Sequence, residues 1–220
     1  MSGAVLRALA FLMLAYTWVT PAEADSWAAP DVQEVFSASR DHFVRITPGK
    51  SLGDTVGFGG SKKGPYAKAE FYARKPDRSY ALTQSIELIN PIAPAQFFVS
   101  NNGHLITIDN WHNVGFGRVV ALYDARGTLV QSYTLEDLFS PAEIAAFPVS
   151  VSSRHWHQGP VYINRDQPTL YLMVGSRRDL VIGLETGRFA FCERRESKDV
   201  CRDSNSDRRW RPLNDIALER

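Results

Sequence analysis

The sequence lacks the short motifs that mark common classes of enzyme. It has no Gly-x-Ser-x-Gly turn, no His-Glu-x-x-His pair and no carboxylate pair at a catalytic spacing. A Gly-rich stretch, residues 57–64, lacks the Gly-Lys-Ser/Thr ending of a phosphate-binding loop. The sequence therefore does not indicate which residue could act as a nucleophile, and we expect no cofactor.

A strong excess of charge of either sign is also missing. The 25 Lys and Arg residues nearly balance the 24 Asp and Glu residues, which gives a formal net charge of +1. Proteins that bind nucleic acid or anionic membranes need a strong positive field, which this composition does not supply. We therefore expect no nucleic-acid partner, and a carbohydrate or a protein of the cell envelope instead.

Long apolar runs are absent except at the N-terminus. A mostly apolar run from Ala8 to Val19 is followed by the triplet Ala22-Glu23-Ala24, whose small outer residues fit the pocket of a signal peptidase. As a helix this run spans about 18 Å, which is short of a bilayer core of about 30 Å and argues against the alternative of a membrane anchor. We therefore predict that residues 1–24 are a cleavable signal peptide, and that the mature protein begins at Asp25 in the periplasm or outside the cell.

Cysteine is scarce, with only Cys192 and Cys201 in the whole chain. In an oxidising compartment an isolated pair indicates one disulfide. Its short loop limits the stabilisation to about 2–3 kcal/mol in the chain-entropy model, so the bond is a local staple. The alternative is a metal or redox pair, which the spacing disfavours because it matches neither a Cys-x-x-Cys motif nor a zinc knuckle.

What the chain does contain is a repeated layout of strands and tight turns. In the middle copy, about residues 97–139, a turn at Asn102-Gly103 leads to an alternating strand over 104–111. Further strands over 118–123 and 128–133 flank a second tight turn. Alternation of period two between Gly, Asn and Asp turns predicts β-hairpins.

The same order of strands recurs on either side, in a first copy over about 36–90 and a shorter third copy over about 161–192. The first two copies also share a tetrapeptide, Val56-Gly57-Phe58-Gly59 and Val114-Gly115-Phe116-Gly117. A shared tetrapeptide in matching loops favours an internal repeat.

Strand, strand, tight turn, strand is the plan of a propeller blade, and these turns resemble those of secreted β-propeller repeats. The middle copy, with its Asp109-Asn110-Trp111-His112 run and its Tyr-Asp-x-x-Gly turn, is also similar to segments of uncharacterised exported bacterial proteins. That resemblance implies export and a β-repeat fold, and no particular activity. Three blades are fewer than a closed propeller usually needs.

We therefore predict an all-β fold of antiparallel blade-like repeats, within a single domain over residues 25–201. The repeats form a partial β-propeller or an open β-meander array; a sandwich and closure as a homodimer are the alternatives. One short connecting helix is predicted at Ser140-Pro141-Ala142-Glu143, which combines a capping residue, a first-turn proline and a glutamate at the third position.

The last residues, 202–220, are predicted to be a polar tail. Asp203 to Asp207 has oxygen ligands at alternate positions, as a calcium loop begins. However, Arg208 and Asn214 stand where such a loop needs glycine and glutamate.

Histidines and an aspartate form the first candidate constellation. On a strand, His155 and His157 would present both imidazoles on one face, an arrangement that can bind zinc or copper. Asp109 and His112 stand at the end of the middle copy's strand, where packing of the copies can bring them to the same place. The alternative is that these are separate loop residues with solvated side chains, and no metal is assigned.

Aromatic residues flank both groups and form the second constellation: Trp111, Phe116, Trp156 and Tyr162. Exposed rings beside Asp, Asn and His suit sugar binding, because a ring stacks on a sugar face while polar neighbours bind its hydroxyls. Packing in the core is the alternative role for these rings.

These features favour an exported β-repeat module that binds a carbohydrate, an envelope component or a protein partner, or that serves as a structural subunit. The predicted binding residues are Asp109, Trp111, His112, His155, Trp156 and His157. The alternative is a metal-dependent or hydrolytic enzyme with a site around Asp109, His112, His155 and His157. The absence of enzyme motifs makes a binding module the preferred hypothesis.

Overall fold

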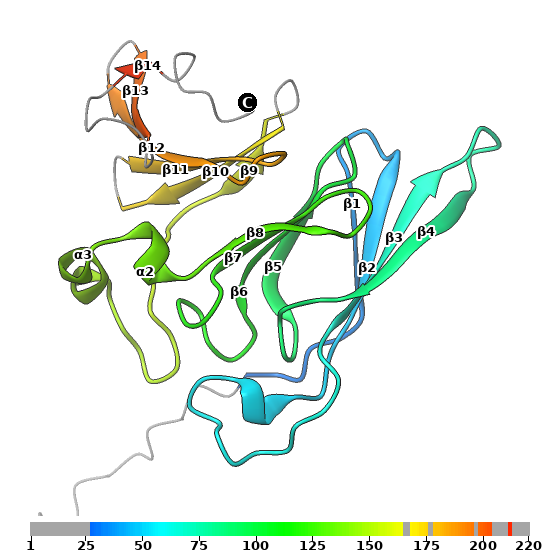
Figure 1. Cartoon of the computed structure of the whole chain (residues 1–220), viewed down its shortest axis with the longest axis horizontal. Coiled ribbons are helices and arrows are strands. Elements are labelled where there is room, and N and C mark those ends of the chain that lie inside the picture. The colour runs from blue at the N-terminus through cyan, green and yellow to red at the C-terminus, as the bar shows by residue number, and fades with distance from the viewer. Residues whose placement is uncertain (1–26, 165–167, 176–177, 196–197, 204–210, 213–220) are drawn as a thin grey trace, which may run out of the picture.

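The computed structural model describes residues 27–164, 168–175, 178–195, 198–203 and 211–212 (Figure 1). The predicted signal peptide and most of the predicted tail, including the calcium-like segment after Asp203, lie outside the described residues. Among the described residues, no helix has the length and apolar content needed to cross a bilayer.

Three antiparallel sheets follow one another along the chain. Sheet 1 contains β1 (Gln33–Phe36), β2 (His42–Thr47), β3 (Lys68–Arg74) and β4 (Tyr80–Glu87). Sheet 2 contains β5 (Pro94–Val99), β6 (Leu105–Asn110), β7 (Val120–Tyr123) and β8 (Leu129–Tyr133). Sheet 3 contains β9 (Val161–Ile163), β10 (Thr169–Val174), β11 (Arg178–Gly183), β12 (Phe189–Arg195), β13 (Lys198–Asp203) and β14 (Arg211–Pro212).

Each sheet is a meander, because every strand pairs with the strand that follows it in the sequence. Antiparallel four-stranded meanders are the unit of a propeller blade, so the predicted all-β, blade-like fold class is confirmed. Sheets 1 and 3 extend beyond the repeat copies expected from the sequence, because β1, β13 and β14 were not predicted. Strand β9 lies at the start of the third copy, where no strand was predicted either. Strands β13 and β14 include residues 202–203 and 211–212 of the segment expected to be a tail.

Sheet 2 lies between the other two sheets (Figure 1). Its strand β6 is buried at every position, because its alternate side chains enter different cores. Leu105 packs toward sheet 1, whereas Ile106 and Ile108 pack toward sheet 3. The continuous burial of β6 is thus the signature of a sheet covered on both faces.

The core between sheets 1 and 2 combines small, branched and aromatic residues. From sheet 1 and its flanks it takes Val44, Ile46, Ala67, Ala69, Phe71 and Leu88, and from sheet 2 Phe97, Val99, Leu105, Ala121 and Tyr123. The hydroxyl of Tyr123 also accepts a hydrogen bond of 3.1 Å from the Ile89 amide, which ties the two sheets together.

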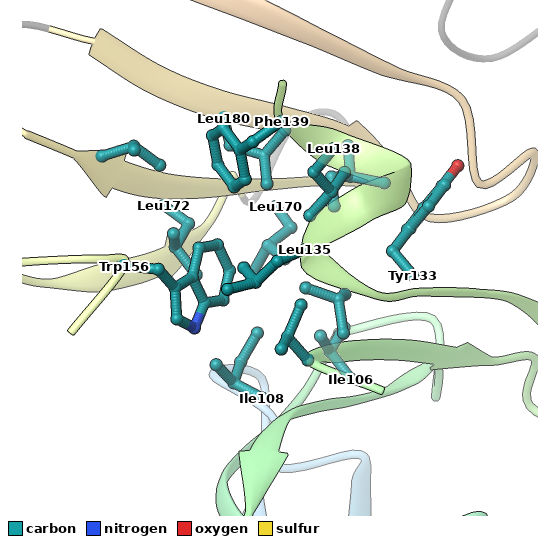
Figure 2. Packing of buried hydrophobic residues seen from close by; sticks show 14 of the residues in the cluster. Ile106, Ile108, Tyr133, Leu135, Leu138, Phe139, Trp156, Leu170, Leu172 and Leu180 are labelled. Carbon is teal, nitrogen blue, oxygen red and sulfur yellow. The ribbon is translucent and has the colours of Figure 1, made fainter. Parts of the chain in front are cut away.

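The core between sheets 2 and 3 is larger, and it includes an indole from the segment before β9. Figure 2 shows Trp156 beside Leu172 of sheet 3 and Leu135 of a short helix, with Ile108 of sheet 2 nearby. Trp156 is only 1% exposed. Burial of a side chain of this size contributes about 2–3 kcal/mol or more, so this residue anchors the segment around it.

Two short helices, rather than the single one predicted, connect sheets 2 and 3: α2 (Leu135–Leu138) and α3 (Pro141–Ala146). Helix α3 has the expected capping box, in which Ser140 and Glu143 bond each other's backbone amides, with proline in its first turn. Helix α2 was not predicted, and it has a second capping box, between Thr134 and Asp137. Besides these, Leu52–Asp54 forms a 3-10 turn, η1, in the long loop before β3.

The predicted Cys192–Cys201 disulfide is confirmed. The two cysteines face each other across β12 and β13, where they are paired in register. Such a bond persists in oxidising compartments, which fits a location outside the cytoplasm.

Candidate functional site

The candidate residues Asp109, Trp111 and His112 lie where β6 ends and the β6–β7 loop, residues 111–119, begins. Two residues here have left-handed backbones, with φ of 57° at Asp109 and 71° at His112. Non-glycine residues seldom adopt this region, and such conformations persist only where the surroundings hold them. The contacts of Asp109 explain what holds this turn.

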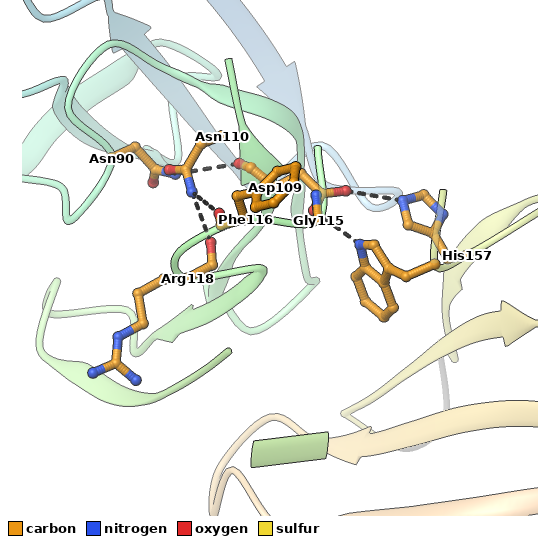
Figure 3. A network of polar contacts seen from close by, with 8 residues as sticks. Asn90, Asp109, Asn110, Gly115, Phe116, Arg118 and His157 are labelled. Carbon is orange, nitrogen blue, oxygen red and sulfur yellow. Dashed lines mark hydrogen bonds and ion pairs between the residues drawn. The ribbon is translucent and has the colours of Figure 1, made fainter. Parts of the chain in front are cut away.

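The carboxylate of Asp109 is buried and accepts hydrogen bonds from the loop and from the segment before β9. Its Oδ1 accepts from the Gly115 amide at 2.8 Å and from the Trp156 indole at 2.9 Å. Its Oδ2 lies 3.1 Å from Nε2 of His157, whose side chain is only 12% exposed. Figure 3 shows this carboxylate between Gly115 and His157. Asp109 thus joins the β6–β7 loop to residues 156–157.

A second network holds the base of the same loop (Figure 3). The side-chain amide of Asn110 donates to the carbonyl groups of Phe116 at 2.9 Å and Arg118 at 3.1 Å. The Asn90 amide in turn donates to Asn110 Oδ1 at 2.8 Å, and to the backbone carbonyl of Asp109. Asn90 Oδ1 is buried without a hydrogen-bond partner among the described residues, so the network is satisfied on the Asn110 side only. The bonds of Asn110 link the end of β6 to the carbonyl groups of its own loop.

The structure separates the two histidines that were expected to share a face. Residues 155–158 are not in a strand, so the alternation that the prediction assumed does not apply. His155 is exposed, whereas His157 is largely buried against Asp109. Within the described part of the chain, no three His, Cys, Asp or Glu side chains lie close enough together to hold a metal ion.

The aromatic residues predicted to flank the site lie in different environments. Trp156 belongs to the core, and Tyr162 stacks on Tyr171 on sheet 3, with ring centroids 4.8 Å apart. Phe116 lies under the Arg154 guanidinium at 5.7 Å. Trp111 is the predicted indole that stays partly exposed.

Trp111 belongs to a group that we name the aromatic cluster, made of Trp27, Phe58, Trp111 and His112. The ring of Trp27 meets Trp111 at 5.6 Å and His112 at 5.8 Å between centroids, and Phe58 meets His112 at 5.6 Å. All four side chains are partly exposed. Partial burial lowers the pKa of His112, which favours a neutral imidazole.

Hydrogen bonds fix both indoles of the aromatic cluster. Trp111 donates to the Ala28 carbonyl at 2.9 Å, and Trp27 donates to Ser152 Oγ at 3.2 Å. The residues come from the N-terminal segment, the long loop of sheet 1 and the β6–β7 loop, so only the folded chain brings them together.

A pocket of about 150 Å³ lies between the long loop of sheet 1 and the β6–β7 loop. Both copies of the shared tetrapeptide contribute to its wall, through Val56 from the first and Phe116 from the second. Its polar wall includes Thr55, Tyr66 and Asn113. None of these three residues was predicted from the sequence, although the repeated tetrapeptide beside Thr55 and Asn113 marks the two loops.

Neither a protein-family model nor a curated protein sequence matches this chain. Two solved structures are similar to it at low identity. The Pseudomonas aeruginosa periplasmic gluconolactonase PpgL has a TM-score of 0.39 and 14% identity, and the match covers 82% of this chain and 55% of that one. HIRA(644-1017) has a TM-score of 0.37 and 10% identity, with 78% and 57% covered. The chain therefore spans little more than half the length of either structure.

Proposed function

We propose that this protein is an exported binding module that recognises a glycan of the cell envelope through the aromatic cluster. The observation that carries the proposal is a pair of partly exposed indoles that meet edge to face, Trp27 from the N-terminal segment and Trp111 from the β6–β7 loop. Aromatic rings stack on the apolar faces of sugars, and the balanced charge of the chain suits a neutral polymer.

Asp109 has a positioning role in this proposal. It is 2% exposed and both its oxygens are engaged, so it is unsuited to contact a ligand directly. Through its contacts with Gly115, Trp156 and His157 it fixes the conformation of the β6–β7 loop in the absence of a ligand. A loop that is already ordered loses less conformational entropy on binding, which increases affinity.

The same contacts argue against the enzyme alternative. A catalytic Asp109 would need an oxygen or its histidine partner to face a substrate, whereas both side chains are buried in the contact between the loop and the Trp156 segment. His155 is exposed, and His112 packs in the aromatic cluster through edge and tilted ring contacts. We therefore do not propose a hydrolytic or metal-dependent reaction.

The experiment is a binding assay of residues 25–220 against a glycan array and insoluble cell-envelope polysaccharides, followed by titration of the best ligand. Trp111→Ala is expected to weaken binding at least tenfold, which corresponds to about 1.4 kcal/mol. Trp111→Phe keeps a ring and should bind with intermediate affinity. Tyr162→Ala is the matched control, because it removes an exposed aromatic ring from sheet 3 outside the aromatic cluster.

The proposal fails if no glycan binds above background, or if Trp111→Ala and Tyr162→Ala weaken binding equally. Circular dichroism of each variant separates loss of binding from loss of folding.

A further inference from the structure

Sheet 1 carries aromatic residues on the face that points away from sheet 2. Val44 and Phe71 enter the core shared with sheet 2, so their neighbours Phe43 and Tyr72 lie on the opposite face, which we name the outer face. An antiparallel sheet with one solvated face usually carries polar residues on that face. Aromatic residues on the outer face therefore indicate a further contact.

The strand register places these residues in one row across all four strands. Phe36 of β1 pairs with Phe43 of β2, and Phe43 pairs with Tyr72 of β3. Tyr72 in turn pairs with Leu82 of β4. The rings of Phe43 and Tyr72 stack with centroids 4.3 Å apart, and Tyr80 meets Phe43 at 5.0 Å. The outer face thus has a continuous apolar row, which we name the outer row: Phe36, Phe43, Tyr72 and Leu82.

The outer row is exposed at both of its ends. Phe36 is 43% exposed and Leu82 is 53% exposed. Sheet 1 lies at one end of the molecule, with sheet 2 against its other face (Figure 1). A contiguous exposed apolar surface is typical of an interaction site, because a partner that covers it removes apolar area from water.

The corresponding face of sheet 3 offers no equivalent partner for the outer row. Alternation along β10, β11 and β12 places a second cluster on the face away from sheet 2, and no member of it is more than 8% exposed: Tyr171, Val181, Ala190, Cys192 and Cys201. A second copy that closed a ring by packing sheet 3 on the outer face would bring side chains that are already buried. The outer face of another copy is the better match.

The charged residues of the outer face occur in pairs of opposite sign. Arg45 lies 2.6 Å from Glu34, and Lys68 lies 2.9 Å from Glu70. In a two-fold contact the same face occurs on both sides, so a face with charges of one sign would repel itself. A face with balanced charges can pack against its own copy.

The register also makes the outer face complementary to itself. Arg45 of β2 pairs with Glu70 of β3, in the row next to that of Phe43 and Tyr72. A two-fold axis that runs between β2 and β3, parallel to the strands, places β2 of one copy over β3 of the other. Each Arg45 then faces Glu70 of the partner subunit, and each Phe43 faces Tyr72 of the partner subunit. Packed sheets keep their strands within about 30° of each other, which preserves this correspondence near the axis.

We propose that two copies of this chain associate through the outer faces of sheet 1, with their outer rows packed together about this two-fold axis. Four strands of about six residues cover roughly 400 Å² on each copy, against about 800 Å² per partner in a standard interface. A small interface gives a weak dimer, so association is expected in the micromolar to millimolar range. The proposal is independent of glycan binding, because the aromatic cluster lies in other segments.

The first test is sedimentation velocity with light scattering on residues 25–220, from about 10 µM to about 1 mM. The mass of the wild-type protein should rise toward that of a dimer with concentration. Leu82→Lys places a charge in the outer row and should weaken dimerisation about tenfold or more. Leu129→Lys is the matched control, because Leu129 is a 43% exposed leucine on the edge strand β8 of sheet 2.

A charge exchange tests the two-fold geometry. Arg45→Glu and Glu70→Arg each bring like charges together across the contact, so either variant alone should weaken the dimer about tenfold or more. In an equal mixture, the new acid of one variant faces the new base of the other, so mixed dimers should form as readily as wild-type dimers. Like charges remain side by side within each chain, so such a recovery comes only from a contact between chains.

The proposal is overturned if wild-type protein stays monomeric at about 1 mM, or if Leu82→Lys and Leu129→Lys dimerise equally well. A dimer that Leu82→Lys disrupts but that the mixture does not restore would mean that the outer face meets a different surface, which contradicts the two-fold arrangement. Circular dichroism of each variant separates loss of association from loss of folding.

Discussion

Replacement of Asp109 by alanine removes the acceptor that joins the β6–β7 loop to the Trp156 segment. The Gly115 amide and the Trp156 indole would then be buried without a partner, at about 1–3 kcal/mol each. Alanine in the left-handed region at this position adds about 1–2 kcal/mol. The expected loss is therefore about 3–8 kcal/mol, a large part of the about 5–15 kcal/mol by which a domain is usually stable.

Asp109→Asn provides the matched comparison. Asparagine tolerates the left-handed backbone and keeps one oxygen for Gly115 and Trp156, so the loss should be only about 1–2 kcal/mol, from the His157 contact. Urea unfolding followed by tryptophan fluorescence measures both variants. An alanine variant within about 1 kcal/mol of wild type, or equal losses in the two variants, would refute the assigned role of the carboxylate.

Gly115→Ala should destabilise the protein by about 1–3 kcal/mol more than Gly57→Ala, because a Cβ at Gly115 lies 2.4 Å from the Arg154 carbonyl and one at Gly57 meets nothing within 4 Å; equal losses in urea unfolding would contradict this. Replacing Cys192 and Cys201 together by alanine should cost about 2–3 kcal/mol, measured the same way, whereas an unchanged midpoint would mean that the bond adds nothing. Burial lowers the pKa values of His104 and His112 below 6.5, so below that pH the unfolded chain takes up protons that the folded chain does not. The melting temperature should therefore fall as the pH drops below about 6.5, and the melting temperatures of wild type and His104→Gln should converge in acid. A difference between the two that does not change with pH would contradict this. Mass spectrometry of exported protein should find an N-terminus at Asp25, and an intact N-terminus in the membrane fraction would favour an anchor.

The central strands could be predicted because apolar and polar residues alternate along them, as buried and less buried positions do. In β2, Val44 and Ile46 face the core while Arg45 between them does not, and this period identifies the strand. Strand β1 was missed because its residues, Gln33–Phe36, are mostly exposed at a sheet edge. Helix α2 was missed because one helical turn after a strand leaves no periodic signal.

The site was less predictable, because its contacts join segments far apart in the sequence. Asp109 and His157 were both candidates, but a spacing in sequence could not indicate that they bind each other rather than a ligand. Trp156 packs in the core, which was one of the two roles predicted for it, but only the structure shows which of the flanking rings are buried. Thr55 and Asn113 have no distinguishing feature until both loops are seen around one pocket.

The central place of sheet 2 has a consequence for how the molecule opens. Sheet 2 shares one core with sheet 1 and a separate core with sheet 3. In repeat proteins each contact between neighbouring units adds its own term to the free energy of unfolding. We therefore expect sheet 1 to unfold separately while sheets 2 and 3 remain folded together. A ligand that bridges the long loop of sheet 1 and the β6–β7 loop would act as a clamp on the first junction alone.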